Sequence, residues 1–225
     1  MSATRPDPLP DAILALTVAI AVGAAVVQGA AHLGNAALFD HSVQLIDADY
    51  DHSAFGWAGS VATIAGLPAS LLLAALQPSR RVLFLALAAL LCFFSLDDAI
   101  FIHERIGELD TRIGLGSSGG RLVWPAFYLP LLAGTLLVLL RVSRGAPAPA
   151  GRQLRTGAGL LVAAVALEVT SYALVRLGYE FRDWPFTIEI VLEEGLELAG
   201  WILIAGALSA AATASLLERG EAAAR

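Results

Sequence analysis

The sequence predicts an all-α fold, a polytopic bundle of about six transmembrane helices, and two observations lead to this prediction. The 225 residues are 57% hydrophobic and 15% charged, whereas soluble domains carry about 25% charged residues, and the mean hydropathy is +0.72. Apolar stretches of roughly 20 residues, the length that crosses about 30 Å of hydrocarbon, recur along the whole chain. The lipid bilayer is therefore the expected partner of nearly every segment.

Six apolar segments are long enough to be the spans. We place them at residues 11–31, 56–76, 82–103, 122–141, 155–177 and 186–213. The transmembrane domain then covers residues 11–213, with a short cytoplasmic segment 1–10 before it and a cytoplasmic tail 214–225 after it. The first span exceeds the roughly 7–15 apolar residues of a secretory signal, so we interpret it as a transmembrane helix. Proline and glycine in RVSRGAPAPAGRQLR, between the fourth and fifth spans, predict a linker that forms helix poorly.

Arginine predicts the orientation, because basic residues are enriched in cytoplasmic loops. One side of the bundle holds both chain ends and most of the arginines: Arg5, Arg80, Arg81, Arg141, Arg144, Arg152, Arg155, Arg219 and Arg225. The opposite side holds the others: Arg105, Arg112, Arg121, Arg176 and Arg182. Trp57, Trp124 and Trp184 lie at span ends on that second side, where amphipathic rings favour the interface. We therefore expect both termini in the cytoplasm. The chain has no lysine and is rich in alanine, a composition that indicates a bacterial protein, so we expect the membrane to be the bacterial inner membrane.

Other classes of protein are excluded by composition or by context. The net charge of −6 and the pI near 5.1 lack the basic footprint of a protein that binds nucleic acid. The single cysteine, Cys92, allows no intramolecular disulfide and no CxxC motif. Gly114, Gly116 and Gly119 spell GxGxxG, but no strand precedes them, so we reject a dinucleotide site.

Acidic side chains gather towards one end of the third and sixth spans. The third span contains LLCFFSLDDAIFIHERIGELD, in which Asp97 and Asp98 lie about 24 Å along the helix, just below the outer interface. His103 and Glu104 follow at that interface. The sixth span runs the other way and contains FTIEIVLEEGLELAGW. Three of its acids recur one helical turn apart and a fourth lies beside this stripe: Glu189, Glu193, Glu197 and Glu194.

An unpaired stripe of carboxylates inside a membrane is unstable. One acid costs at least about 2.5–3.5 kcal/mol on insertion scales, and like charges one turn apart repel each other. Bound cations, protonation of some carboxyl groups, or arginines from other helices would each neutralise the stripe. The arginines on the correct side for an interhelical polar clasp are Arg105, Arg176 and Arg182.

The histidines indicate a metal site more specifically than the acids do. All four map to the outer side, together with the acidic loop between the first two spans: His32, His41, His52 and His103. Imidazole with carboxylate is the ligand set of zinc, iron or manganese, and His103 beside Glu104 is the strongest candidate. We therefore predict a divalent metal ion between the third and sixth spans, bound by Asp97, Asp98, His103, Glu189, Glu193 and Glu197.

Two short segments resemble a known family. SLDDAIFIHE in the third span and LEEGLELAG in the sixth are similar to the two acidic signatures of an uncharacterised family of bacterial multipass membrane proteins. In that family an Asp-Glu pair stands where this chain has Asp97 and Asp98. The resemblance implies a multi-pass membrane protein and brings no activity with it.

Three functions fit these features. The first is a metal-dependent hydrolase that acts on a lipid-like substrate, with Glu104 or Glu194 as the catalytic general base. The second is proton- or cation-coupled transport, because Glu168 lies near mid-membrane on the fifth span, where an acid is a candidate for a proton path. The third is a non-catalytic accessory protein, in a homo-oligomer or with another membrane subunit, whose acids form the polar clasp.

Overall fold

A computed structural model describes residues 7–50, 52–100, 102, 105–106, 123–180 and 182–224 of this chain. These residues form α-helices and two short 3-10 turns, and no strand occurs among them. The main helices are α1 (Leu9–Phe39), α2 (Ala54–Ala65), α3 (Leu67–Leu76), α4 (Arg81–Ile100), α6 (Val123–Arg144), α7 (Ala148–Arg176) and α8 (Trp184–Ala223). The predicted all-α fold is therefore confirmed.

Five segments are long and apolar enough to cross a membrane. They are α1, α2 together with α3, the turn Pro78–Arg80 together with α4, α7, and α8. These segments correspond to the first, second, third, fifth and sixth predicted spans. α6, with 22 residues, occupies the place of the fourth. α8 extends beyond its predicted span, because the helix continues through most of the predicted tail to Ala223.

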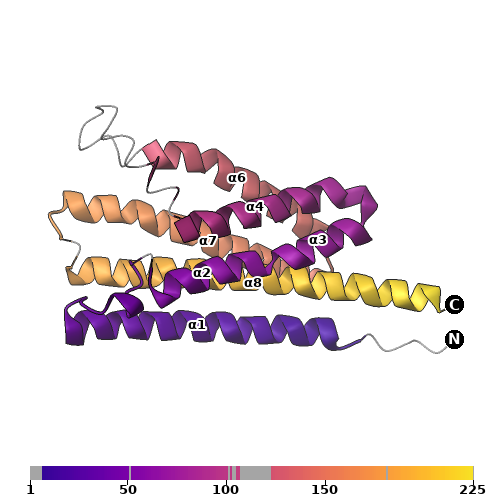
Figure 1. Ribbon diagram of the computed structural model, residues 1–225, viewed down its shortest axis with the longest axis horizontal. Helices are drawn as coiled ribbons and strands as arrows, with labels where there is room; N and C mark the ends of the chain where they lie inside the picture. Colours follow the sequence, from indigo (N-terminus) through magenta and orange to yellow (C-terminus); the bar gives the residue numbers. More distant parts are fainter. Residues whose placement is uncertain are drawn as a thin grey trace.

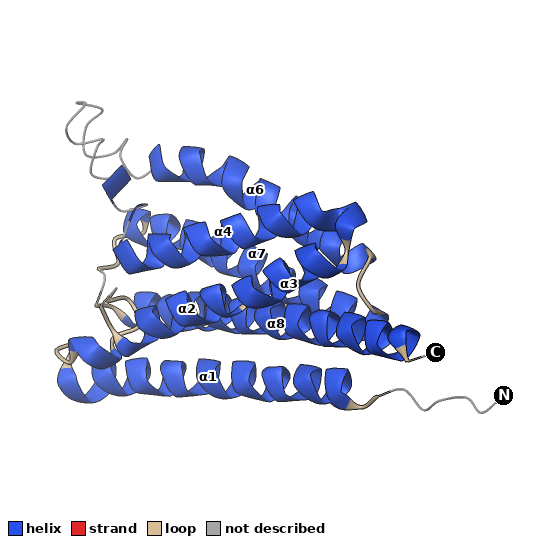
Figure 2. Ribbon diagram, turned by 45° about the vertical axis from the view of Figure 1, so that its right-hand side comes forward, coloured by secondary structure: helices blue, strands red, loops and turns tan. Residues whose placement is uncertain are grey.

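The central helix of the bundle is α8. It packs most extensively against α1 and α7, and it also contacts α2 and α3. α4 packs against α2, α3 and α6, and α6 also packs against α7. Figures 1 and 2 show that the start of α1 and the end of α8 lie at the same end of the bundle. This arrangement places the acidic half of α8 at the opposite end, near the connection between α1 and α2.

Two glycines allow α7 and α8 to approach each other closely. A Cβ atom added to Gly157 would lie 2.8 Å from the carbonyl oxygen of Gly200, and one added to Gly200 would lie 3.1 Å from the carbonyl oxygen of Gly157. Both distances are shorter than ordinary van der Waals contact, so larger residues would push the helices apart. Leu154, Ile204 and Leu208 fill the adjoining core and have no exposed surface. The close approach fixes α7 relative to the acids of α8.

The prediction of a poorly helical linker between the fourth and fifth spans is wrong. α6 continues to Arg144 and α7 begins at Ala148, so only residues 145–147 separate the two helices. Pro147 is the N-cap of α7 and Pro149 lies in its first turn. The N–H groups of a first turn have no partner within the helix, so proline costs no hydrogen bond there. Proline therefore begins this helix instead of preventing it.

Candidate functional site

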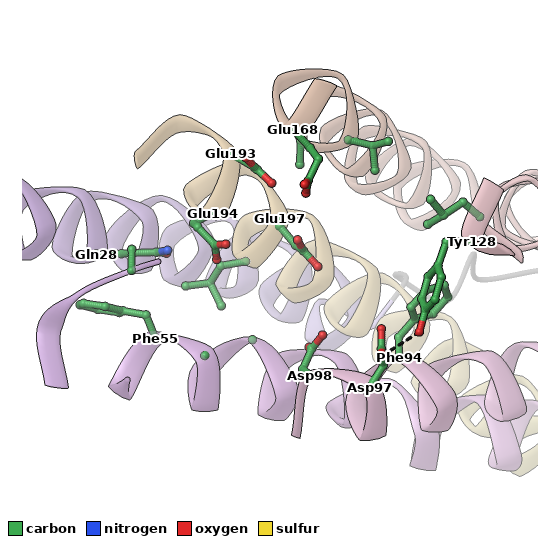
Figure 3. Close-up of a pocket in the computed structure, with 17 residues that line it drawn as sticks. Gln28, Phe55, Phe94, Asp97, Asp98, Tyr128, Glu168, Glu193, Glu194 and Glu197 are labelled. Carbon is green, nitrogen blue, oxygen red and sulfur yellow. Dashed lines mark hydrogen bonds between the residues drawn. The ribbon is translucent and has the colours of Figure 1, made fainter. Parts of the chain in front are cut away.

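Six of the acids that the sequence singles out line one pocket, which we call the carboxylate pocket (Figure 3). Its volume is about 200 Å³. Three helices contribute the acids: Asp97 and Asp98 from α4, Glu168 from α7, and Glu193, Glu194 and Glu197 from α8. Residues that the sequence placed on three separate spans therefore share one cavity.

Helical spacing explains why α8 contributes three carboxylates. Glu193 and Glu197 are one turn apart, and Glu194 follows Glu193 at about 100° round the helix axis. Figure 3 shows the side chain of Glu193 directed towards Glu168 and that of Glu197 directed towards Asp98. α8 thus presents acids to α7 and to α4 at the same time.

On the α4 side of the pocket, Asp97 is held by a tyrosine. Its Oδ1 accepts a hydrogen bond of 2.7 Å from the hydroxyl of Tyr128 in α6, and both residues are buried. This length is usual for a hydrogen bond between a hydroxyl group and another oxygen atom. The sequence does not predict Tyr128 as a site residue, because a single tyrosine near a span end gives no indication of its partner.

Carboxyl groups in and beside the pocket lie close enough to repel one another. The carboxyl of Glu193 is within hydrogen-bonding reach of Glu168 and of Glu189. Glu194 experiences repulsion from four acids: Glu197, Asp49, Asp98 and Glu168. Glu189 is buried next to the pocket and does not line it, and its Oε1 has no hydrogen-bond partner among the described residues. Acids this close cannot all be ionised without added positive charge.

None of the arginines proposed for a polar clasp lines this pocket. Among the lining residues that the structure describes, none is basic. Arg182 instead lies 3.4 Å from Asp40, and both side chains are largely exposed. Arg105 and Arg176 are also exposed. The described part of the chain therefore provides no arginine to neutralise the acids of α8.

The acids of α4 and α8 meet across the cavity, because the two helices pack mainly against other neighbours. α4 packs against α2, α3 and α6, whereas α8 packs against α1, α7, α2 and α3. The rings of Phe94 and Trp201, 5.6 Å apart, join the two helices beside the pocket. His103 and Glu104, the predicted ligand and general base that follow α4, lie outside the described residues.

Gln28 of α1 is a pocket residue that the sequence prediction missed. Its side chain lines the carboxylate pocket and is 1% exposed. Its Oε1 has no hydrogen-bond partner among the described residues, and Figure 3 shows its amide group directed towards Glu194. A lone glutamine in an otherwise apolar stretch was the available signal.

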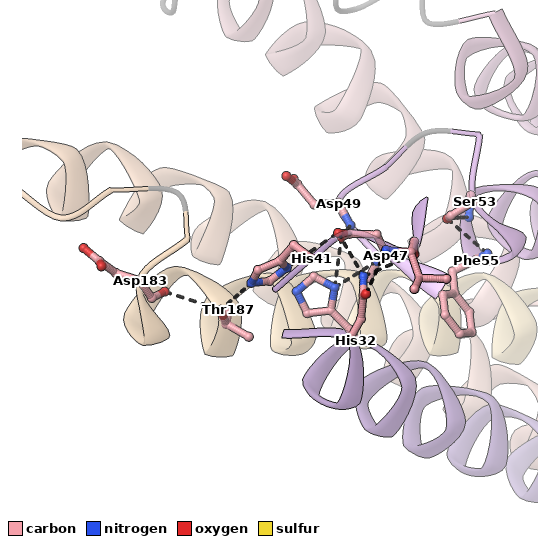
Figure 4. A network of polar contacts seen from close by, with 12 residues as sticks. His32, His41, Asp47, Asp49, Ser53, Phe55, Asp183 and Thr187 are labelled. Carbon is pink, nitrogen blue, oxygen red and sulfur yellow. Dashed lines mark hydrogen bonds and ion pairs between the residues drawn. The ribbon is translucent and has the colours of Figure 1, made fainter. Parts of the chain in front are cut away.

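A second polar cluster lies where α1 ends (Figure 4). His32, His41 and Asp47 each offer a ligand atom within 4.8 Å of the other two, so this group can hold a metal ion. Nδ1 of His32 is 3.1 Å from Oδ1 of Asp47, and Nδ1 of His41 is 3.5 Å from Oδ2. Of the residues that the structure describes, these three form the one group with such a close ligand arrangement.

Hydrogen bonds fasten the connection between α1 and α2 onto the end of α1. Asn35 exchanges two bonds with the backbone of Val43, at 3.1 and 3.2 Å, and donates a third to Asp47. The N–H of Ala48 donates to Nδ1 of His32 at 3.0 Å. Ala48 also lines the carboxylate pocket. The cluster and the pocket therefore share the same segment of backbone.

Comparison with known proteins gives a family match and no further relative. The model of a domain of unknown function, DUF8692, matches residues 12–211. No curated protein and no solved structure matches the chain. The match covers every helix that contributes to the pocket, so the site belongs to the matched domain.

Proposed function

The chain belongs to the DUF8692 family, and we propose that it is a six-span protein of the bacterial inner membrane whose carboxylate pocket binds a divalent metal ion. α6 supplies the fourth span in this proposal and completes the set of six. The pocket faces the periplasm and both termini lie in the cytoplasm. The distribution of arginines supports this orientation, as does the position of the start of α1 and the end of α8 at one end of the bundle.

One observation carries the proposal: six carboxylates from three helices line a single cavity, and its described lining contains no basic side chain. An acid within a membrane costs at least about 2.5–3.5 kcal/mol on insertion scales, so a group of them requires neutralisation. A divalent ion supplies two positive charges, and the acids must draw together to bind it, because no three of the described pocket acids have ligand atoms within 4.8 Å of one another. Gln28 lines the same cavity, and the nitrogen of its amide group points towards Glu194 (Figure 3).

The proposed ligands come from both sides of the cavity. Asp97, Asp98, Glu193 and Glu197 supply carboxylates. His103, which lies outside the described residues, is proposed from the sequence alone as the imidazole ligand. Carboxylates with one imidazole suit zinc, iron or manganese. Glu189 does not line the pocket, so in this proposal it acts on the metal through its contact with Glu193.

The reaction proposed for this site is hydrolysis of a lipid-like substrate. A divalent metal ion held here would supply an activated water, and a neighbouring carboxylate would accept the proton of that water. Glu194 and Glu104 are the candidates for this general base. Val26 and Val27 of α1 and Leu96 of α4 are exposed next in sequence to the pocket residues Gln28 and Asp97. In a membrane these side chains would contact lipid, which is the reason for proposing a substrate with an apolar tail.

Elemental analysis of the purified protein in detergent tests metal binding. We expect at least one zinc, iron or manganese ion per chain whose retention requires Glu193 and Glu197. Glu193→Gln and Glu197→Gln remove a negative charge with little change of shape, whereas Glu218→Gln alters an exposed acid of the same helix and serves as the control. Folded wild-type protein that contains no metal after exposure to each of the three would rule the proposal out.

A second candidate, proton-coupled transport, rests on a different observation. Glu168 of α7 is within hydrogen-bonding reach of Glu193 of α8, so a proton can pass between carboxyl groups of two helices. We expect transport to depend on Glu168 if this candidate is correct. Proton flux into proteoliposomes that is equal for wild type and Glu168→Gln would eliminate it.

A further inference from the structure

We propose that His32, His41 and Asp47 form a second metal site, of the zinc class, which fastens the connection between α1 and α2 beside the carboxylate pocket. Two imidazoles and one carboxylate are a common ligand set for zinc, with a water or another group in the fourth position. None of these residues lines the carboxylate pocket. The inference is therefore independent of the metal proposed there.

The distances in the cluster match a shared ion. Nitrogen and oxygen ligands lie about 2.0–2.1 Å from zinc, so two of them in a tetrahedral site are about 3.3 Å apart. The separations are 3.1 Å between His32 and Asp47 and 3.5 Å between His41 and Asp47. Both separations are near this value, but they end on different oxygens of Asp47. One shared ion therefore requires the Asp47 carboxylate or the His41 ring to turn, with all three ligand atoms starting within 4.8 Å of one another.

The hydrogen bonds of His32 indicate that a cation belongs in this cluster. Nδ1 accepts the N–H of Ala48 at 3.0 Å, so in this arrangement it carries no proton. It nevertheless lies 3.1 Å from a carboxylate oxygen of Asp47, which is also an acceptor. Two acceptors at this distance repel each other. A zinc ion between them relieves the repulsion, and because it takes the one lone pair of Nδ1, the N–H of Ala48 must release the ring when the ion binds. The opposite ring nitrogen, Nε2, is fully buried and has no hydrogen-bond partner among the described residues.

His41 favours a metal ion over a single proton. The rings of His32 and His41 are 5.3 Å apart, and both direct Nδ1 towards the same carboxylate group. A single proton can be shared between Asp47 and one of the two histidines. Nδ1 of the other histidine then still faces Asp47 as a second acceptor. A zinc ion can bind Nδ1 of both histidines and one carboxylate oxygen of Asp47 at the same time. Its two positive charges then exceed the negative charge of Asp47 by one.

The ligands are already oriented by their neighbours, as in metal sites whose outer hydrogen bonds hold the ligands in place. Asp47 accepts bonds of 3.2 Å from the Asn35 side chain and from the N–H of Asp49. Nε2 of His41 lies 3.5 Å from the hydroxyl of Thr187 in α8. Asp40 and His41 both adopt left-handed backbone angles, with φ of 48° and 57°. Such angles are uncommon outside glycine, although aspartate and histidine adopt them more often than most residues, and here they turn the chain so that His41 meets His32.

A zinc ion in this cluster would affect the carboxylate pocket through shared backbone. Ala48, which follows the ligand Asp47, forms part of the pocket wall. Asp49 lies close enough to Glu194 to repel it. Fixing Asp47 therefore fixes the wall on the side where α1 ends. The zinc site would keep this part of the pocket wall in place, and none of its ligands would line the pocket.

Zinc titration of the full-length protein, purified in detergent and stripped with a chelator, tests the proposal. Competition with a chromophoric chelator gives the affinity for zinc. We expect one zinc ion per chain at this site, with binding weakened at least 100-fold in His41→Ala and in Asp47→Asn. His52→Ala, an exposed histidine of the same connection, is the matched control and should bind zinc as wild type does. Glu193→Gln should also retain this zinc, even if it loses metal from the carboxylate pocket.

Cobalt provides a readout that does not depend on the variants folding. Co²⁺ bound to wild-type protein should give the visible absorption of a four-coordinate nitrogen and oxygen site, and zinc should displace it. Absence of zinc and cobalt binding in wild-type protein would overturn the proposal and leave a proton as the shared cation. Zinc binding that survives His41→Ala and disappears in Glu193→Gln would overturn it as well, because the ion would then belong to the carboxylate pocket.

Discussion

The hydroxyl of Tyr128 donates a 2.7 Å hydrogen bond to Oδ1 of Asp97, and this bond joins α6 to α4 at the edge of the carboxylate pocket. Asp97 is 4% exposed and Tyr128 is 5% exposed, so water does not replace the bond easily. The bond fixes one of the proposed metal ligands before any ion arrives. Four predictions follow from this contact and from the others described above.

Tyr128→Phe removes the hydroxyl and keeps the ring. We expect the variant to lose about 1–3 kcal/mol of stability, the usual cost of leaving a buried acceptor without its hydrogen-bond donor, and to bind metal in the pocket more weakly. Thermal unfolding in detergent and metal titration measure the two effects. Tyr179→Phe, at a tyrosine with 43% exposure, is the control and should change neither quantity. Equal behaviour of the two variants would show that the Asp97 contact has no energetic role.

Glu168→Gln removes one of the acids that face Glu193. Because like charges repel in the empty pocket, we expect the metal-free variant to unfold at a higher temperature than metal-free wild type. About 1 kcal/mol of relieved repulsion raises the midpoint by roughly 2–4 °C in a chain of this size. Added metal should stabilise the variant less than it stabilises wild type. Glu180→Gln, at an exposed acid, provides the comparison, and a lower midpoint for metal-free Glu168→Gln would contradict the account of repulsion.

Gly157→Ala inserts a methyl group where α7 meets α8. Its Cβ would lie 2.8 Å from the carbonyl oxygen of Gly200, so the helices must separate. We expect a loss of about 1–3 kcal/mol, the usual range for overpacking, measured as thermal unfolding. Gly159→Ala, in the same helix with nothing within 4 Å of the added atom, should be neutral or stabilising. A stable Gly157→Ala would mean that α7 and α8 are not closely packed.

Asn35→Ala removes the side chain that anchors the connection between α1 and α2. It loses two bonds to Val43 and one to Asp47. We expect backbone amides of residues 43–49 to exchange with deuterium at least tenfold faster, while those of α8 keep their protection. Gln44→Ala, at an exposed residue of the same connection, should leave exchange unchanged. Unaltered exchange in Asn35→Ala would show that other contacts hold this segment.

Helices and the grouping of acids along them follow from sequence periodicity. Five of the six predicted spans match apolar helices, and the i+4 spacing of Glu193 and Glu197 places both on the pocket side of α8. These features depend on local helix geometry, which can be inferred directly from the spacing of residues in the sequence. Pro147 and Pro149 misled the prediction of the linker because proline both breaks helices and begins them. The position of a proline relative to the helix start decides between the two effects.

Sequence periodicity does not predict the contacts between distant segments. The partnership of His32 with His41 and Asp47 depends on the left-handed turn at Asp40 and His41, and no residue there is a glycine that would indicate such a turn. Gln28 enters the pocket because α1 packs against α8, and helix order in a bundle cannot be read from six similar apolar stretches. Tyr128 meets Asp97 for the same reason, through the packing of α6 on α4.

The central claim is that the carboxylate pocket holds a divalent metal ion, and anomalous diffraction from crystals of the metal-loaded protein tests it most directly. Data collected above the absorption edge of zinc, iron or manganese locate the ion independently of the surrounding density. We predict a peak between α4 and α8, within about 2.0–2.2 Å of carboxylate oxygens from Asp97 or Asp98 and from Glu193 or Glu197. A pocket with no anomalous peak, in protein supplied with each of the three metals, would contradict the claim.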